Sequence, residues 1–209
     1  MRIAVVNETS AVDKHAAIMA ALDGRGLEIL NAGMAAKGET PELQYIHTGF
    51  IAALLLATDR VDMVVGGCGT GQGFMNAAMQ YRGVFCGHLL TPLDAFLFAR
   101  INEGNVISLA LNQGWGWAGE VNLRMLFDQL FTDEAGGGFP THRAEPQAAS
   151  REALRAISEA AHRCMKGTVE RLPDEIIVPA ITHPAAAAVL DIPTVADEEL
   201  RAALEARLP

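Results

Sequence analysis

The sequence has 209 residues, half of them apolar and a fifth charged, with a formal net charge of −9. This length and composition indicate one folded domain, or one domain with an appended arm, and they exclude a disordered chain. The acidic balance excludes a nucleic-acid-binding surface, because such surfaces need clustered lysine and arginine and the sequence has no such cluster.

The first residues give no sign of a targeting or membrane segment. The chain runs directly into the apolar residues 3–6 without a charged leader, and it has no long uncharged apolar run. We therefore expect a cytoplasmic protein that contacts no membrane.

Short apolar runs alternate with helical patterns up to about residue 110. The expected strands are residues 3–6, 27–30, 61–65, 84–86 and 106–109, and the expected helices are 13–22, 41–58, 72–80 and 92–102. This alternation is typical of βαβ units, and uniformly apolar strands are typical of a parallel sheet covered on both faces. We predict a three-layer, Rossmann-like α/β fold with a five-stranded parallel sheet in the flavodoxin-like order 2-1-3-4-5.

Two of these helices have recognisable beginnings. Thr40-Pro41 and Thr91-Pro92 each place a capping hydroxyl before a proline at the first helical position, and Asp94 adds an acidic residue to the first turn. We therefore expect helices to begin at Pro41 and at Pro92.

The pattern changes after the fifth expected strand. A helix is expected over residues 119–131, a loop rich in glycine and proline over 134–146, and further helices over 150–165 and 197–207. We predict an α/β domain over residues 1–145 and a C-terminal helical arm over 146–209 that packs at a subunit interface.

The three cysteines, Cys68, Cys86 and Cys164, lack the spacing of a zinc site, so no metal is expected. A lone cysteine is most simply a small buried residue, which is the expectation for Cys86 and Cys164. Cys68 differs because it lies in a glycine-rich segment, Gly-Gly-Cys-Gly-Thr-Gly-Gln-Gly over residues 66–73, where the third strand gives way to a helix.

Two common glycine-rich loops do not fit this segment. A nucleotide phosphate loop ends in Gly-Lys-Ser/Thr, but Gly73 is followed by Phe74, and no glycine triplet has the spacing of a dinucleotide loop. A thiol among backbone N–H donors does fit general-base chemistry, because such donors favour the thiolate and stabilise a developing oxyanion. Isomerisation of an aldose to a ketose needs such a base, and a positioned base accelerates a reaction roughly 10²–10⁴-fold.

The sequence resembles the ribose-5-phosphate isomerase B and galactose-6-phosphate isomerase family, whose members carry a Cys-Gly-Thr/Ser-Gly-x-Gly loop after the third strand of a Rossmann-like fold. The resemblance covers roughly residues 1–145. Besides the loop, the matching segments are Tyr45-Ile46-His47, Val61-Asp62, Ala77-Ala78, Gly83-Val84, and Asn102 with Asn105-Val106.

The resemblance implies catalytic roles for Cys68, as the proton-transferring base, and for Thr70, at the ring or carbonyl oxygen. It implies that the loop amides stabilise the enediolate and that Asn102 contacts substrate hydroxyls. Residues that the resemblance or their position marks as substrate-binding are Asn7, Glu8, His47, Gly69, Gly71, Gly73, His88, Asn102, His142 and Arg143.

Several positions depart from the family pattern. The N-terminal Asp-His pair falls at Glu8-Thr9, Ile101 replaces the ring-opening histidine, and Phe85 replaces an arginine. Either His47 or His88 is a candidate to open the ring instead. Because bidentate arginine contacts usually hold phosphates, the smaller number of arginines leaves a non-phosphorylated or uronate-derived sugar open as the alternative to a sugar phosphate of the ribose-5-phosphate or galactose-6-phosphate type.

We therefore expect an aldose–ketose isomerase of a small sugar or sugar phosphate, without a cofactor. The resemblance implies a homodimer or a dimer of dimers with active sites at the subunit boundary, where Arg143 reaches the partner's pocket. Two rival functions stay open, a non-catalytic sugar-binding protein on the same fold and a flavodoxin-like flavin carrier.

Overall fold

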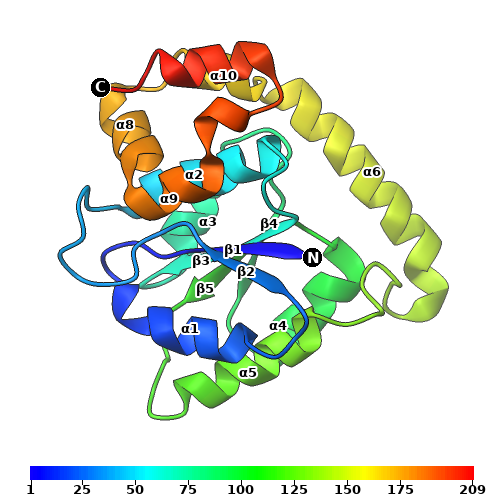
Figure 1. The fold of residues 1–209 in the computed structure, drawn as a ribbon. Coiled ribbons are helices and arrows are strands. Elements are labelled where there is room, and N and C mark those ends of the chain that lie inside the picture. Colours follow the sequence, from blue (N-terminus) through cyan, green and yellow to red (C-terminus); the bar gives the residue numbers. More distant parts are fainter.

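Five apolar segments form one parallel sheet, as the sequence predicts (Figure 1). The computed structural model describes every residue from Met1 to Pro209. The strands are β1 (Arg2–Val6), β2 (Glu28–Asn31), β3 (Met63–Cys68), β4 (Cys86–Leu89) and β5 (Val106–Ala110).

The strand order across the sheet is β2-β1-β3-β5-β4, so the predicted order 2-1-3-4-5 is wrong at one side. β5 pairs with both β3 and β4, which leaves β4 at the edge. The cause is visible in the side chains: Val106 to Leu109 are buried, whereas Cys86 to His88 are only partly buried. A strand buried on both faces fits the inside of a parallel sheet, and a shorter, more polar strand fits its edge.

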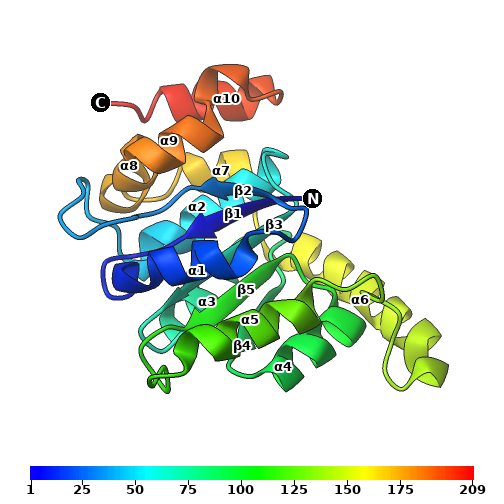
Figure 2. The same cartoon turned by 60° about the horizontal axis from the view of Figure 1, so that its bottom comes forward.

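Helices cover both faces of the sheet (Figures 1 and 2). One face packs against α1 (His15–Leu22), α4 (Pro92–Leu97) and α5 (Gly119–Leu130), and the other against α2 (Tyr45–Ala57) and α3 (Gln72–Ala78). The alternation of side chains along β1 follows this division, because Ile3 and Val5 join the first core and Ala4 and Val6 the second. The predicted three-layer α/β architecture is confirmed.

One of the two predicted helix starts is confirmed. Thr91 caps α4, where its hydroxyl accepts from the Asp94 N–H and Asp94 completes a capping box. The expected start at Pro41 is wrong, because α2 begins at Tyr45 after the cap residue Gln44. Leu43 is buried and its carbonyl accepts from the Thr9 N–H, a contact that holds this stretch outside the helix.

The expected helix over residues 92–102 is α4 followed by a π-helical segment, η2 (Phe98–Asn102). After α5 come two 3-10 segments and five helices, which with η1 (Val12–Lys14) complete the chain: η3 (Thr141–Arg143), α6 (Ala144–Ala161), α7 (Met165–Val169), α8 (Asp174–Thr182), α9 (Pro184–Leu190), η4 (Ile192–Thr194) and α10 (Glu198–Glu205). α6 starts earlier than expected because Pro146 falls in its first turn, where a proline breaks no helical hydrogen bond.

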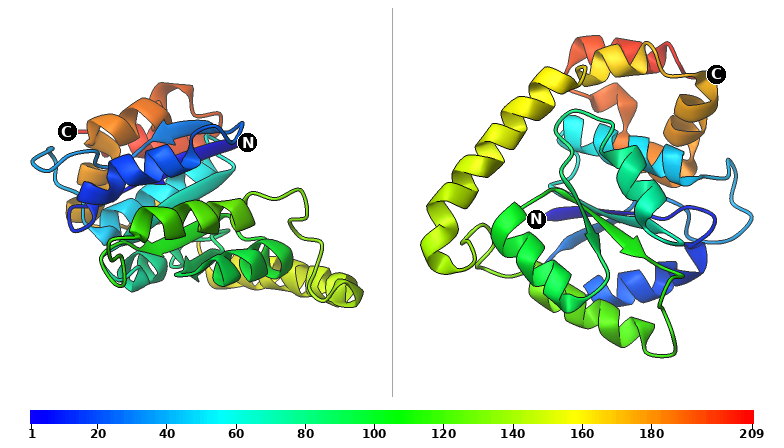
Figure 3. Two further views of the ribbon diagram at one scale, coloured as in Figure 1. Left: turned by 90° about the horizontal axis from the view of Figure 1, so that it is seen from below. Right: turned by 180° about the vertical axis from the view of Figure 1, so that it is seen from behind.

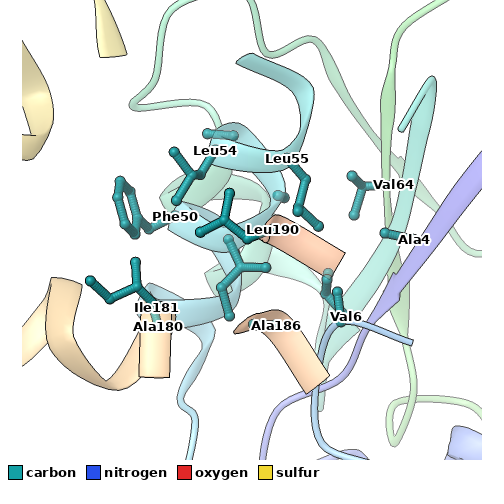
Figure 4. Packing of buried hydrophobic residues seen from close by; sticks show 14 of the residues in the cluster. Ala4, Val6, Phe50, Leu54, Leu55, Val64, Ala180, Ile181, Ala186 and Leu190 are labelled. Atoms are coloured by element: carbon teal, nitrogen blue, oxygen red, sulfur yellow. The ribbon is translucent and has the colours of Figure 1, made fainter. Parts of the chain in front are cut away.

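α6 runs along one side of the molecule and leads the chain to the C-terminal helices (Figure 3). α8 and α9 then pack on α2, so that α2 lies between them and the sheet. Figure 4 shows this packing, with Leu54 of α2, Ile181 of α8 and Leu190 of α9 in one apolar cluster. The tail therefore contributes to the core of its own chain, and its contact with a partner subunit stays a prediction.

No single helix combines the length and apolar composition needed to cross a membrane; by those criteria alone, only the bent pair formed by residues 174–182 and 184–194 would.

Candidate active site

Cys68 is the last residue of β3 and lies opposite Ala110 of β5, at the carboxyl edge of the sheet. Its side chain is buried, with 7% of the residue exposed. Sγ lies 3.9 Å from the hydroxyl oxygen of Thr70, and either atom can be the donor. The structure therefore joins the two residues that the sequence predicts to be catalytic.

The sequence analysis expects backbone N–H donors around the Cys68 thiol. This expectation is wrong for Sγ itself, because no amide donates a hydrogen bond to the sulfur. The Gly69 N–H donates to Ser10 Oγ (3.2 Å), and the Gly71 N–H turns back to the Cys68 carbonyl (3.3 Å). Other amides of the segment, those of Thr70, Gly73 and Phe74, have no protein acceptor. Phe74 is completely buried, so the free N–H groups of Thr70 and Gly73, rather than those of Gly69 and Gly71, are available to an oxyanion.

Glycine is required at position 71 for two reasons. Its φ of 76° lies in the left-handed region, and a Cβ there would lie 2.5 Å from His88 Nε2. The imidazole thus packs directly on the glycine, while His88 Nε2 lies 2.9 Å from the Thr70 carbonyl oxygen. A carbonyl only accepts, so Nε2 carries the proton and His88 holds the loop in shape.

Glu8 is joined to the loop through a residue that the sequence analysis did not single out. Glu8 is 3% exposed, and its carboxylate accepts from both the N–H (3.0 Å) and the hydroxyl of Ser10. Ser10 Oγ in turn accepts from the Gly69 N–H, and the Ser10 carbonyl accepts from the Asn112 side chain at 2.8 Å. The Glu-x-Ser spacing after β1 was the only signal for this bridge.

Asn7 is fully buried, and its side-chain nitrogen lies 2.9 Å from His15 Nδ1. Burial lowers the pKa of His15, while the negative charge of Glu39 opposes this effect. Because the lowered pKa favours the neutral imidazole, Nδ1 accepts from the Asn7 amide. The helical periodicity of the sequence gives no sign of this contact.

His47 uses both ring nitrogens in structural contacts. Its Nδ1 accepts from the Gln44 N–H (2.9 Å), and its Nε2 lies 3.0 Å from the Glu175 carbonyl oxygen of α8. The residue is 7% exposed. A ring-opening role for His47 would require breaking one of these bonds, whereas His88 keeps a free Nδ1.

Asn102, His142 and Arg143 do not join this site within one chain. Asn102 precedes the amino end of β5, whereas Cys68 pairs with its last residue, so the length of the strand, roughly 13 Å, separates them. The segment 136–138 hydrogen-bonds to η2 and brings η3, with His142 and Arg143, to the Asn102 side. The predicted site residues thus form two groups, one at the carboxyl ends of the strands and one at their amino ends.

A groove of about 640 Å³ runs along the exposed side of β4, between η2 and α6. Its lining includes His88 and Asn102 but not Cys68. This volume is that of a small-molecule pocket, yet the thiol lies outside it. Within one chain, Cys68 is therefore not part of this groove.

No group of histidine, cysteine, aspartate or glutamate side chains has the geometry of a metal site. Burial raises the pKa of Cys86 to about 12, so its thiol stays protonated and fits the expected role of a small buried residue. The same expectation is wrong for Cys164, which is exposed just before α7.

Residues 3–137 match a family model described as Ribose/Galactose Isomerase. No curated protein matches the chain.

Two solved structures are similar over almost the whole length. One is a ribose-5-phosphate isomerase from Vibrio parahaemolyticus, 36% identical, which covers 100% of this chain and 99% of its own with a TM-score of 0.93. The other is a 4-deoxy-L-threo-5-hexosulose-uronate ketol-isomerase complexed with a tartrate, 34% identical, which covers 99% of both chains with a TM-score of 0.92. A type B ribose 5-phosphate isomerase from Trypanosoma cruzi, 21% identical, covers 78% of this chain and 98% of its own with a TM-score of 0.65, and shows the shared fold alone.

Proposed function

Because this chain belongs to the ribose/galactose isomerase family, we propose that it interconverts the aldose and ketose forms of a small sugar, with Cys68 as the proton-transferring base. The observation that carries the proposal is the placement of this thiol at the carboxyl end of β3, beside a hydroxyl and a loop with amides that have no protein acceptor. Ligands of open parallel sheets bind at this edge.

The proposed reaction moves one proton between adjacent carbons. The Cys68 thiolate removes the proton from C2 of the open-chain aldose, the C–H electron pair forms the C1–C2 double bond, and the carbonyl electron pair moves onto O1. The resulting thiol returns the proton to C1, and the electrons on O2 form the ketone. Thr70 lies close enough to Sγ to move a proton between the two oxygens, so the net reaction needs no oxidant or reductant.

The negative charge on the enediolate oxygen needs fixed donors. The free N–H groups of Thr70 and Gly73 are such donors, because they are part of a loop whose carbonyl oxygens at residues 68–71 already accept hydrogen bonds. Removing one donor of this kind costs enzymes roughly 10²–10³-fold in kcat.

The substrate we favour is a sugar acid related to 4-deoxy-L-threo-5-hexosulose uronate, with ribose 5-phosphate as the second candidate. The side chains that hydrogen-bond to the loop are those of Ser10, Thr70, His88 and Ser108, none of which is a permanent cation. A phosphate dianion is commonly held by arginine forks, whereas a carboxylate can be held by fewer donors. Both candidates have a full-length structural neighbour, the uronate ketol-isomerase and the ribose-5-phosphate isomerase, so the choice between them rests on the absence of cations at the loop.

We further propose that two copies of the chain complete each site. Asn102 lies at the edge of the sheet remote from Cys68, and His142 and Arg143 are exposed and take part in none of the chain's ion pairs. A second copy that packs along the open β4 groove would bring these side chains to the first copy's Cys68 edge.

The test is a panel of candidate substrates incubated with the purified protein in D₂O and followed by NMR. We expect deuterium on the carbon next to the carbonyl of the uronate-derived sugar, with slower or no exchange into ribose 5-phosphate. Faster exchange into ribose 5-phosphate would reverse the order of the two substrates. Tight binding of a sugar without any exchange would support the rival function of a sugar-binding protein.

A further inference from the structure

The C-terminal helices lie outside the segment that the isomerase family shares. Residues 138–209 follow the end of the family match, yet α8 and α9 pack on α2 and share its core. Burial of apolar surface explains their stability but not the polar contacts that they make with the catalytic domain. One of these polar contacts leads to the Cys68 loop.

The contact joins α8 to the beginning of α2. The backbone carbonyl of Glu175 in α8 lies 3.0 Å from His47 Nε2. Because His47 Nδ1 accepts from the Gln44 N–H, the ring proton is on Nε2, which donates to Glu175. A buried imidazole with both nitrogens satisfied in this way has one orientation, so the first turn of α2 is tied to α8.

The first turn of α2 in turn contacts the loop. Tyr45, the first residue of α2, lies with its ring against Gly73, where an added Cβ would be 3.2–3.3 Å from three ring atoms. Gly73 carries one of the free amides assigned to the enediolate. One helical turn further along, α2 approaches α3 so closely that a Cβ on Gly49 would lie 2.7 Å from the Ala77 Cβ. A shift of α2 would therefore move both the loop and the helix that follows it.

We propose that His47 is a positioning residue, through which the C-terminal helices hold the oxyanion-binding part of the Cys68 loop in its active shape. The proposal rests on the proposed isomerase function. It gives residues beyond the shared family segment a part in catalysis without any contact with substrate, and it replaces the predicted role of His47 as a substrate ligand or ring-opening group.

Two substitutions separate the two bonds of His47. In His47→Gln the amide nitrogen can reach the position of Nε2 and keep the bond to Glu175, whereas in His47→Asn the amide oxygen can keep only the bond to Gln44. Thr58→Ala is the control, because it removes a hydrogen bond at the far end of α2 without touching α8 or the loop.

The first readout is amide hydrogen exchange of residues 69–75, which requires no substrate. We expect faster exchange of this segment in His47→Asn than in the wild type, with wild-type rates in His47→Gln and Thr58→Ala. Unchanged loop exchange in a folded His47→Asn protein would overturn the proposal whether or not the protein is an isomerase.

The second readout is steady-state kinetics on the substrate that the D₂O panel identifies. His47→Asn should lower kcat about tenfold to a hundredfold with KM nearly unchanged, because the bound geometry and not the affinity is lost, and His47→Gln should restore most of the rate. Equal losses in both variants with a raised KM would instead make His47 a substrate ligand, against the proposal. If His47→Asn fails to fold, Gly73→Ala tests the next contact in the series, the packing of the Tyr45 ring on the loop. Wild-type loop exchange and kcat in Gly73→Ala would also contradict the proposal.

Discussion

The close packing of His88 on Gly71 gives a sharp prediction for the substitution Gly71→Ala. The left-handed conformation costs a residue with a Cβ about 1–2 kcal/mol. The new methyl would also lie 2.5 Å from His88 Nε2 and 3.0 Å from the Leu109 carbonyl oxygen. The imidazole must therefore move, and the loss of its bond to Thr70 adds about 0.5–1.5 kcal/mol.

Gly83→Ala is the matched control, because Gly83 has a φ of 77° and no atom within 4 Å of its Cβ position. We expect urea denaturation to show a loss of about 1–2 kcal/mol for Gly83→Ala, from the backbone alone, and about 1.5–3.5 kcal/mol for Gly71→Ala, where the lost hydrogen bond adds to the same backbone cost. Only Gly71→Ala should lower kcat, about 10²-fold, because the loop shifts relative to the thiol. A Gly71→Ala protein with wild-type kcat, or two variants with equal losses of stability, would refute the reasoning.

Three further outcomes are expected. Ser10→Ala should lower kcat about tenfold with little change in KM, because it frees Gly69 from its tie to Glu8, and Ser10→Thr should restore the rate; a fully active alanine variant would contradict the bridge. Burial lowers the pKa of the His183 imidazole, so the unfolded chain binds a proton there more readily than the native chain, and native stability falls as pH drops below about 6.5. The melting temperature of His183→Gln should therefore fall less than that of the wild type between about pH 7.5 and 5.5. Equal falls in melting temperature in the two proteins would exclude His183 as the cause. At about pH 8, iodoacetamide should alkylate the exposed Cys164 much faster than Cys86, whose pKa burial raises to about 12, and equal rates measured by mass spectrometry would contradict that environment.

Most strands and one helix cap could be predicted from local sequence patterns. Short apolar runs located β1, β2, β3 and β5 to within three residues, because strands covered on both faces need apolar residues. The expected strand 84–86 overlaps β4 only at Cys86, because this edge strand is more polar and only partly buried. The cap at Thr91 was equally local, since its hydroxyl and Asp94 bond within the same turn. The glycine loop beside Cys68 stood out for the same reason.

Two features depend on contacts between distant segments. One is the strand order, and the other is whether a site residue lies at the carboxyl or the amino ends of the strands. β5 passes between β3 and β4 because its side chains are more deeply buried, a comparison that no single segment contains. That order and the parallel direction put Asn102 at the opposite edge from Cys68.

The side chains that support the site also escaped the sequence analysis. Ser10 meets Gly69 across 59 residues of sequence, and His47 meets Glu175 across 128. Such partners are chosen by the packed structure, and neither composition nor periodicity encodes them. The contribution of the C-terminal tail to the core of its own chain was missed for the same reason, because the packing of α8 and α9 on α2 joins distant parts of the sequence.

The most direct measurement of the role of Cys68 is solvent deuterium uptake by the substrate with wild-type protein, Cys68→Ala and Cys86→Ala compared under one set of conditions. The account predicts that Cys68→Ala keeps its fold and melting temperature within a few degrees but incorporates deuterium only at the uncatalysed rate, while Cys86→Ala exchanges like the wild type. Deuterium uptake by Cys68→Ala at the wild-type rate would show that another group moves the proton.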